Sequence, residues 1–181
     1  MPNVSAHLLI VLGLTLSATS PSLGQEHASA QAPFDAGVRG ATAEVSFTVP
    51  SKARYSFYLD LYFQDGDARD PDRREDRARV GALAGSGAYD SNTMRRRDNG
   101  VPIPVRLTVT RIGGADRDIV FSEVFREHVR EGFTANYFSK LIVRRELTEG
   151  RYRAKIEALE DVPSLRTTPI RFDVHVAFDR S

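Results

Sequence analysis

Strict alternation of apolar and polar residues is the feature that most constrains this chain. In the run RYSFYLDLYF, residues 54–63, every second side chain is apolar or aromatic, so one face of an extended strand can be buried. The same period of two recurs in further segments, at 43–49, 103–112, 118–126, 138–147, 151–159 and 170–178. Strands with one apolar face each must pack as two sheets. The sequence therefore predicts an all-β, antiparallel β-sandwich of about seven strands.

The longest interruption of the strand pattern is a charged insertion at residues 64–100. Asp70 followed by Pro71 is a typical helix start, with a side-chain acceptor at the N-cap and proline at the first helical position. We expect one short helix that ends at Gly85, followed by a loop through residues 86–100. The insertion also holds a cluster of aspartates close enough in sequence to reach one Ca²⁺ ion, although its glycine is misplaced for an EF-hand. These candidate calcium ligands are Asp65, Asp67, Asp70 and Asp72. The alternative is a solvated loop in which the arginines neutralise the carboxylates.

The N-terminal segment has the features of a cleaved export signal. Its apolar run, LLIVLGLTLSAT, is too short to span a membrane and is followed by the small-residue site Ser22-Leu23-Gly24. We expect a signal peptide at 1–24, a flexible lead-in at 25–41 and the β-sandwich domain at 42–181. No second long apolar run follows, so we expect no transmembrane segment in the mature protein and a periplasmic or secreted location.

The composition removes several classes of function. The chain has no cysteine, so a disulfide, a thiolate metal site and an acylated lipoprotein cysteine are all ruled out. Basic and acidic residues number 25 and 24, which gives a formal net charge of +1. Such a balance offers no argument for nucleic acid or an anionic membrane as a partner.

One motif suggests a more specific fold. In LTEGRYRAKIEAL, Gly150 permits a tight turn and Tyr152 opens a strand, as in the tyrosine corner of immunoglobulin-like sandwiches. Together with RARVGALAG, NGVPIPVRLTV, FSKLI and TPIRFDVHV, this pattern resembles an uncharacterised proteobacterial family of exported small domains, many of them lipoproteins, catalogued as a domain of unknown function. The resemblance covers about residues 42–179 and implies an immunoglobulin-like sandwich in the cell envelope. It also allows a role as an immunity factor for an antibacterial toxin, and it supplies no catalytic residues.

Constellations that carry catalysis are weak in this sequence. Asp173 and His175 lie on the same face of the last strand, where they could form an acid/base or zinc pair, but no third ligand is identifiable. The sequence AGSGA around Ser86 lacks the flanking glycines of a nucleophile elbow. We therefore expect no enzyme, no catalytic residue and no cofactor.

Two groups of aromatic residues remain as candidate partner-binding surfaces. The loop GFTANYF carries Phe133, Tyr137 and Phe138, and the outward face of the strand at 54–63 carries Tyr58 and Tyr62. The alternatives are that the phenylalanines plug the end of the sandwich and that the insertion covers the two tyrosines. The leading hypothesis is a non-catalytic domain that binds an envelope or toxin protein, as an inhibitor or immunity protein. The alternative is a small-ligand or glycan-binding module, with an enzyme third.

Overall fold

The structure is a computed structural model of the chain, and it describes residues 29–87, 98–113 and 118–177. The expected signal peptide lies outside the described residues. So do parts of the loop predicted at 86–100 and of the turn that precedes residue 118. No helix within the described ranges is long and apolar enough to cross a membrane.

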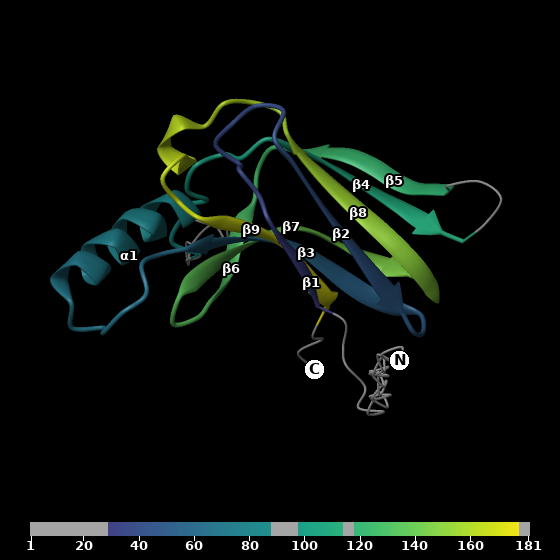
Figure 1. The fold of residues 1–181 in the computed structure, drawn as a ribbon, viewed down its shortest axis with the longest axis horizontal. Coiled ribbons are helices and arrows are strands. Elements are labelled where there is room, and N and C mark those ends of the chain that lie inside the picture. Colours follow the sequence, from purple (N-terminus) through teal and green to yellow (C-terminus); the bar gives the residue numbers. More distant parts are fainter. Residues whose placement is uncertain (1–28, 88–97, 114–117, 178–181) are drawn as a thin grey trace, which may run out of the picture.

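Two antiparallel sheets pack face to face, which confirms the predicted β-sandwich (Figure 1). One sheet has five strands in the order β1-β9-β3-β7-β6, and the other has four in the order β2-β8-β4-β5. Each of the seven predicted segments forms a strand. The strands are β1 Ala30–Pro33, β2 Thr42–Val49, β3 Ala53–Tyr62, β4 Val105–Ile112, β5 Asp118–Phe125, β6 Val129–Phe133, β7 Tyr137–Leu147, β8 Gly150–Ala158 and β9 Ile170–Val176.

The two remaining strands lie where the sequence predicted irregular structure. β1 falls within the expected flexible lead-in, pairs with β9, and is followed by the core residue Phe34. The prediction of a flexible lead-in is therefore wrong from Ala30 onward, and the folded domain begins before residue 42. β6 falls in the expected loop before residue 138 and pairs with β7 through a register shift between Arg130 and Gly132. Both strands are short, and neither alternates clearly enough to be recognised alone.

The core lies between the two sheets. The inward residues of β3 predicted from its alternation, among them Tyr55, Phe57 and Leu59, are fully buried. Tyr152 forms the expected corner, because its hydroxyl donates to the carbonyl oxygen of Thr148 at 2.8 Å. β3 is also buried on its outward side, since the side chains of β7 and β9 flank it there.

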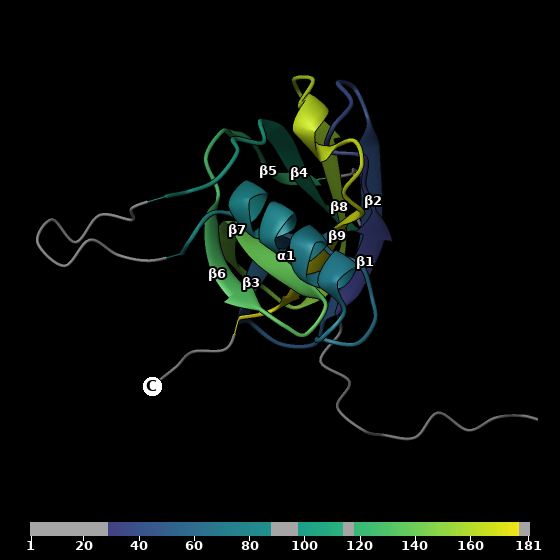
Figure 2. The ribbon, with the colours of Figure 1, turned by 90° about the vertical axis from the view of Figure 1, so that its left-hand side faces the viewer.

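The insertion forms the predicted helix, α1 Pro71–Ala84, which packs across one end of the sandwich against β7 and β3 (Figure 2). The Asp70 side chain accepts a hydrogen bond from the Asp72 amide at 3.0 Å, which confirms the predicted N-cap. Lys140 of β7 forms hydrogen bonds at the other end of the helix. Its buried Nζ donates to the carbonyl oxygens of Leu83, Asn99 and Val101 at 3.4, 2.6 and 3.1 Å.

Candidate binding face of the five-stranded sheet

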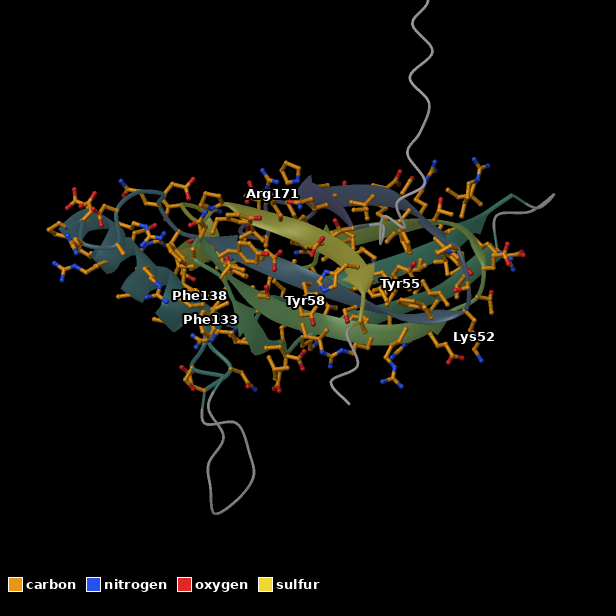
Figure 3. All side chains as sticks on the ribbon, turned by 90° about the horizontal axis from the view of Figure 1, so that it is seen from below. Lys52, Tyr55, Tyr58, Phe133, Phe138 and Arg171 are labelled. Atoms are coloured by element: carbon orange, nitrogen blue, oxygen red, sulfur yellow. The ribbon has the colours of Figure 1, made fainter. Side chains whose placement is uncertain are left out.

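The outer side of the five-stranded sheet is the candidate functional site. Figure 3 looks directly at it: β9, β3 and β7 cross the view, α1 lies at one end, and no element of the described chain covers the middle. In the strand register Asp60 lies opposite Ser139 on β7 and Arg171 on β9. The open face, as we call it, consists of Tyr58, Asp60, Tyr62, Tyr137, Ser139, Arg171, Asp173 and His175.

Two carboxylates lie at the centre of the open face. Asp60 and Asp173 are only 4% and 8% exposed, and the Oδ1 atom of each is buried without a hydrogen-bond partner. Asp60 accepts a hydrogen bond from Ser139, and Oδ2 of Asp173 lies 2.8 Å from Nδ1 of His175. Burial raises the pKa of Asp60 to about 6; Ser139 and His175 oppose the shift and the charge of Asp173 adds to it. The face therefore holds a poorly solvated negative charge at neutral pH.

Three tyrosines surround these carboxylates. The Tyr62 and Tyr137 rings lie 4.8 Å apart between centroids, and both side chains are half-buried. Burial, followed by the charge of Asp60, raises the pKa of both hydroxyls. The Tyr58 ring stacks on His175 at 5.0 Å, and its hydroxyl donates to Glu131 at 3.4 Å. Tyr62 and Tyr137 thus form an aromatic rim beside Asp60, whereas Tyr58 is part of the packing beneath.

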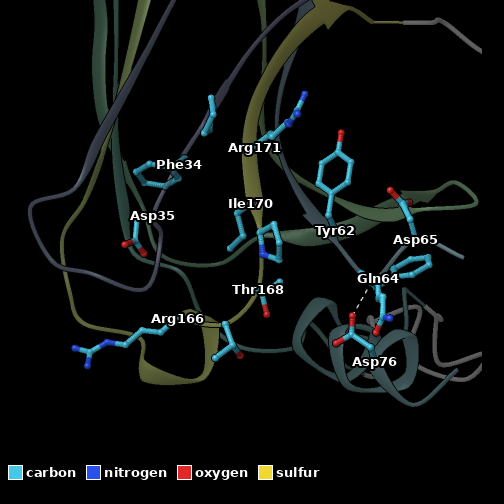
Figure 4. A pocket seen from close by; sticks show the side chains of 14 residues that line it. Phe34, Asp35, Tyr62, Gln64, Asp65, Asp76, Arg166, Thr168, Ile170 and Arg171 are labelled. Carbon is cyan, nitrogen blue, oxygen red and sulfur yellow. Dashed lines mark hydrogen bonds between the residues drawn. The ribbon is translucent and has the colours of Figure 1, made fainter. Parts of the chain in front are cut away.

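A groove of about 900 Å³ continues the open face toward α1 (Figure 4). Tyr62 and Arg171 belong to both surfaces, and the Arg171 guanidinium lies 5.4 Å from the Tyr62 ring centroid. Helix α1 contributes one wall through Asp76, whose Oδ2 accepts a hydrogen bond from the Gln64 amide at 2.7 Å. The lining residues are Pro33, Phe34, Asp35, Tyr62, Phe63, Gln64, Asp65, Asp76, Arg166, Thr167, Thr168, Pro169, Ile170 and Arg171. The insertion therefore shapes a concave site of a size that small ligands occupy.

The predicted partner-binding residues differ in how accessible the structure leaves them. Tyr62 and Tyr137 come together, and the Phe133 side chain is 68% exposed at the end of β6. Phe138 is only 6% exposed, because its ring packs on Phe63 and under the Arg130 guanidinium. Phe138 therefore plugs the end of the sandwich, as the alternative interpretation predicted. Neither Phe138 nor the buried Tyr58 is available to a partner, and α1 packs at the sheet end without covering Tyr58 (Figure 3).

Three of the four aspartates predicted as calcium ligands have local roles, and Asp72 lies in the first turn of α1. Asp70 caps the helix, Asp67 Oδ1 accepts a hydrogen bond from the Arg69 amide at 2.8 Å, and Asp65 lines the groove. Within the described ranges, no group of three or more His, Cys, Asp or Glu side chains is placed to hold a metal ion. Asp173 and His175 are in contact, as their shared face predicted, but Asp173 is buried rather than a surface residue.

Several residues of the site were not singled out from the sequence. Asp60 and Ser139 are outward positions of their strands, yet only the pairing of β3 with β7 brings them into contact. Arg171 and Thr168 reach the groove because β9 pairs with β3. The usable signal was the polar Asp60 between Tyr58 and Tyr62 on the outward side of the most apolar strand.

Comparison with known proteins identifies a family and a fold. Residues 31–176 match the model of a family described as a domain of unknown function, and this match begins within β1. No curated protein matches the chain. A solved structure of a protein from Sulfurospirillum deleyianum is similar, with 17% sequence identity and a TM-score of 0.68. The similarity covers 83% of this chain and 98% of that one, and at this identity it shows the fold alone.

Proposed function

The chain belongs to the DUF5625 family, whose function is unknown, and we propose that it is a non-catalytic domain that binds a protein partner through the open face. The signal-like N-terminal sequence supports a site of action in the bacterial envelope, either periplasmic or after secretion. In this proposal the partner is an envelope protein or a toxin, and the domain acts on it as an inhibitor or immunity protein.

The difference between the two outer sheet surfaces is the observation that carries this proposal. On the four-stranded sheet, outward side chains pair with one another across strands: Arg106 with Glu157 at 3.0 Å, Arg153 with Glu44 at 3.2 Å, and Thr108 with Ser122 at 2.8 Å. Such cross-strand pairs suit a surface that faces water, and the exposed apolar residues of this side, Ile119 and Val124, lie at its β5 edge. The open face instead combines half-buried tyrosines with carboxylate oxygens that lack partners.

Phe133 supplies an exposed aromatic side chain at the edge strand β6, beside the open face rather than on it. It lies opposite Phe138 in the β6–β7 register, so it points to the same side of the sheet as Phe138, whereas the neighbouring Tyr137 points to the open face. Aromatic residues are enriched in the cores of protein interfaces, where they bury a large area at a low cost in side-chain entropy. The hairpin and the Tyr62–Tyr137 pair therefore supply the apolar contacts that a protein interface requires.

Affinity capture with matched variants tests the proposal. The tagged protein would be used to capture partners from the envelope fraction of its own cells, and each captured protein would be quantified by mass spectrometry. We expect Phe133→Ala and Tyr137→Ala each to reduce a stoichiometric partner at least tenfold. The control is Val124→Ala, because Val124 is 47% exposed on β5 at the edge of the other sheet. A partner that depends on Val124 but on neither aromatic residue would refute the open face as the binding surface.

The groove favours a second candidate function, the binding of a small ligand or glycan. Phe34 and Ile170 give it apolar walls, and Asp65, Arg166 and Thr168 supply polar groups that can orient a ligand. A thermal-shift screen against a glycan and metabolite library tests this function. A hit should lose its stabilising effect in Thr167→Trp, which fills the groove from an exposed position. A hit that is unaffected by this substitution binds elsewhere.

A further inference from the structure

We propose that the open face recognises a basic side chain of its partner, a lysine or arginine, seated against Asp60 and Asp173 beside the rings of Tyr62 and Tyr137. This inference rests on the proposed function and specifies the chemistry of the contact.

Uncompensated negative charge is the first observation. Buried carboxylates are almost always paired with a cation, and buried polar atoms nearly always have a hydrogen-bond partner. Asp60 and Asp173 lie on neighbouring strands, and each has a buried oxygen without a partner. Within the described part of the chain, no lysine or arginine forms a salt bridge with either one.

The nearby basic residues of the chain are engaged elsewhere. Arg171 lies opposite Asp60 in the strand register, but it stacks on Tyr62 and its Nη1 donates to Gln31 Oε1 at 2.7 Å. Arg144 forms an ion pair with Glu131. His175 contacts Asp173 through one nitrogen, and its ring stacks on Tyr58. None of these basic residues in the described part of the chain neutralises the two carboxylates, and in our proposal a partner supplies the positive charge.

The aromatic rim is the second observation, and it favours a cation over other groups. The faces of tyrosine rings attract lysine and arginine, and ammonium groups are commonly bound by aromatic rings together with carboxylates. The half-buried Tyr62, Tyr137 and His175 surround the buried carboxylates, and in our proposal the basic group approaches between them. An acidic or purely apolar partner group would bury Asp60 further without compensating its charge, which is costly.

Acidification should weaken the proposed contact. The charged and titratable groups facing Asp60 are Asp173, His175 and Arg171 on β9, Tyr137 on β7, and Tyr58 and Tyr62 on β3 itself. As the pH falls below about 6, Asp60 takes up a proton and becomes neutral. This change reduces the attraction for a basic side chain, so affinity should fall from pH 7.5 to pH 5.

Titration with small model compounds tests the inference without knowledge of the partner. The ¹⁵N-labelled protein would be titrated with N-acetyl-arginine amide and N-acetyl-lysine amide, with the citrulline and norleucine counterparts as neutral probes. We expect amide shifts confined to residues 58–62, 137–139 and 171–175, with the basic probes binding at least tenfold more tightly than the neutral ones. Equal responses to basic and neutral probes, or shifts elsewhere, would overturn the inference.

Variants separate this contact from general electrostatic attraction. Asp60→Asn removes one charge with almost no change in shape, and Tyr137→Leu removes an aromatic ring from the half-buried rim. Each substitution should lower the affinity for the basic probes at least tenfold. Glu149→Gln removes the same charge from an exposed turn and should change nothing. If Asp60→Asn does not fold, Tyr137→Leu still decides the question. Unchanged binding by folded Asp60→Asn and Tyr137→Leu would overturn the inference.

The inference and the proposed function can fail separately. A partner lost with Phe133→Ala and Tyr137→Ala but retained at full strength by folded Asp60→Asn would leave the binding domain in place and remove the basic contact. If basic probes bind at Asp60 but capture of the partner does not depend on Phe133 or Tyr137, the site for a basic group stands and the open face is removed as the partner's binding surface.

Discussion

The Tyr152 hydroxyl should stabilise the fold more than the Tyr55 hydroxyl, which is also in the core. It donates to the Thr148 carbonyl at 2.8 Å, whereas the Tyr55 hydroxyl lies 3.5 Å from the Thr48 carbonyl. Because the shorter bond satisfies a carbonyl of a tight turn, we expect Tyr152→Phe to lower the free energy of unfolding by about 1–2 kcal/mol. Urea unfolding measures this change, with Tyr55→Phe as the matched control. Equal losses in the two variants would contradict the role of the corner.

Asp60 should make stability depend on pH in a direction opposite to that of a salt-bridged carboxylate. Its pKa is raised by burial to about 6 in the folded state, so folding favours the protonated form. The resulting stability is fully present below about pH 3.8 and is lost as the pH rises through about 6. Asp60→Asn mimics the neutral form. We expect it to raise the free energy of unfolding at pH 7 by up to about 3 kcal/mol, and much less at pH 4.

Urea unfolding of both proteins between pH 4 and pH 7 tests this prediction. His128 acts in the opposite sense, because burial lowers its pKa to about 4 and its neutral ring bonds the Ile103 carbonyl. That contribution is common to both proteins and cancels in their difference. A difference that stays constant across the pH range would show that Asp60 is not a buried, uncompensated acid.

For single residues, the sequence predicted the direction of a side chain better than it predicted how deeply that side chain is buried. Alternation correctly placed Phe57 inward and Tyr62 outward, because direction in a strand follows from local geometry alone. It could not predict that Asp60 is buried, since that burial depends on β7 and β9, which pair with β3 from distant parts of the chain. The same limit explains why Phe138 was proposed as a surface residue.

Lys140 links the end of the inserted helix and the segment that follows it to the sandwich. Its buried amine satisfies three carbonyls at the end of α1 and in the following segment, and burial lowers its pKa to about 8. Lys140→Met would leave the Asn99 and Val101 carbonyls without this donor, whereas the Leu83 carbonyl still accepts from the Val101 amide at 2.9 Å. We expect a loss of about 2–4 kcal/mol in the free energy of unfolding. Amide hydrogen exchange in residues 71–84 should rise as well. Lys155→Met, at an exposed position of β8, is the control. Unchanged exchange in α1 would contradict this assignment.

Elements with strong local signals were predictable, and elements that depend on a partner strand were not. The Asp70-Pro71 start gave the position of α1, and alternation gave seven strands. β1 and β6 lack such patterns. β1 is a four-residue strand, AQAP, without a large apolar residue and ending in Pro33, and β6 contains Gly132 at a register shift. Their strand conformation is set by pairing with β9 and β7.

At the scale of the whole molecule, the two outer sides of the sandwich differ in how their polar groups are paired. Cross-strand pairs such as Arg106–Glu157 occupy the outer side of the four-stranded sheet, which also exposes Ile119 and Val124 at its β5 edge. The other side combines the open face with a groove that α1 helps to form, and the exposed Phe133 lies at its β6 edge. The insertion, which the sequence left unexplained, therefore extends the open face into the groove.

Site-specific photo-crosslinking in the cells that produce the protein is the measurement that tests the binding face most directly. Benzoyl-phenylalanine would replace Tyr137 on the open face or, as the control, Thr108 on the outer side of the four-stranded sheet. We predict one dominant crosslinked protein from position 137 and none from position 108. Crosslinking from position 108 alone, or none from 137 when a partner co-purifies, would contradict the assignment of the five-stranded sheet as the binding face.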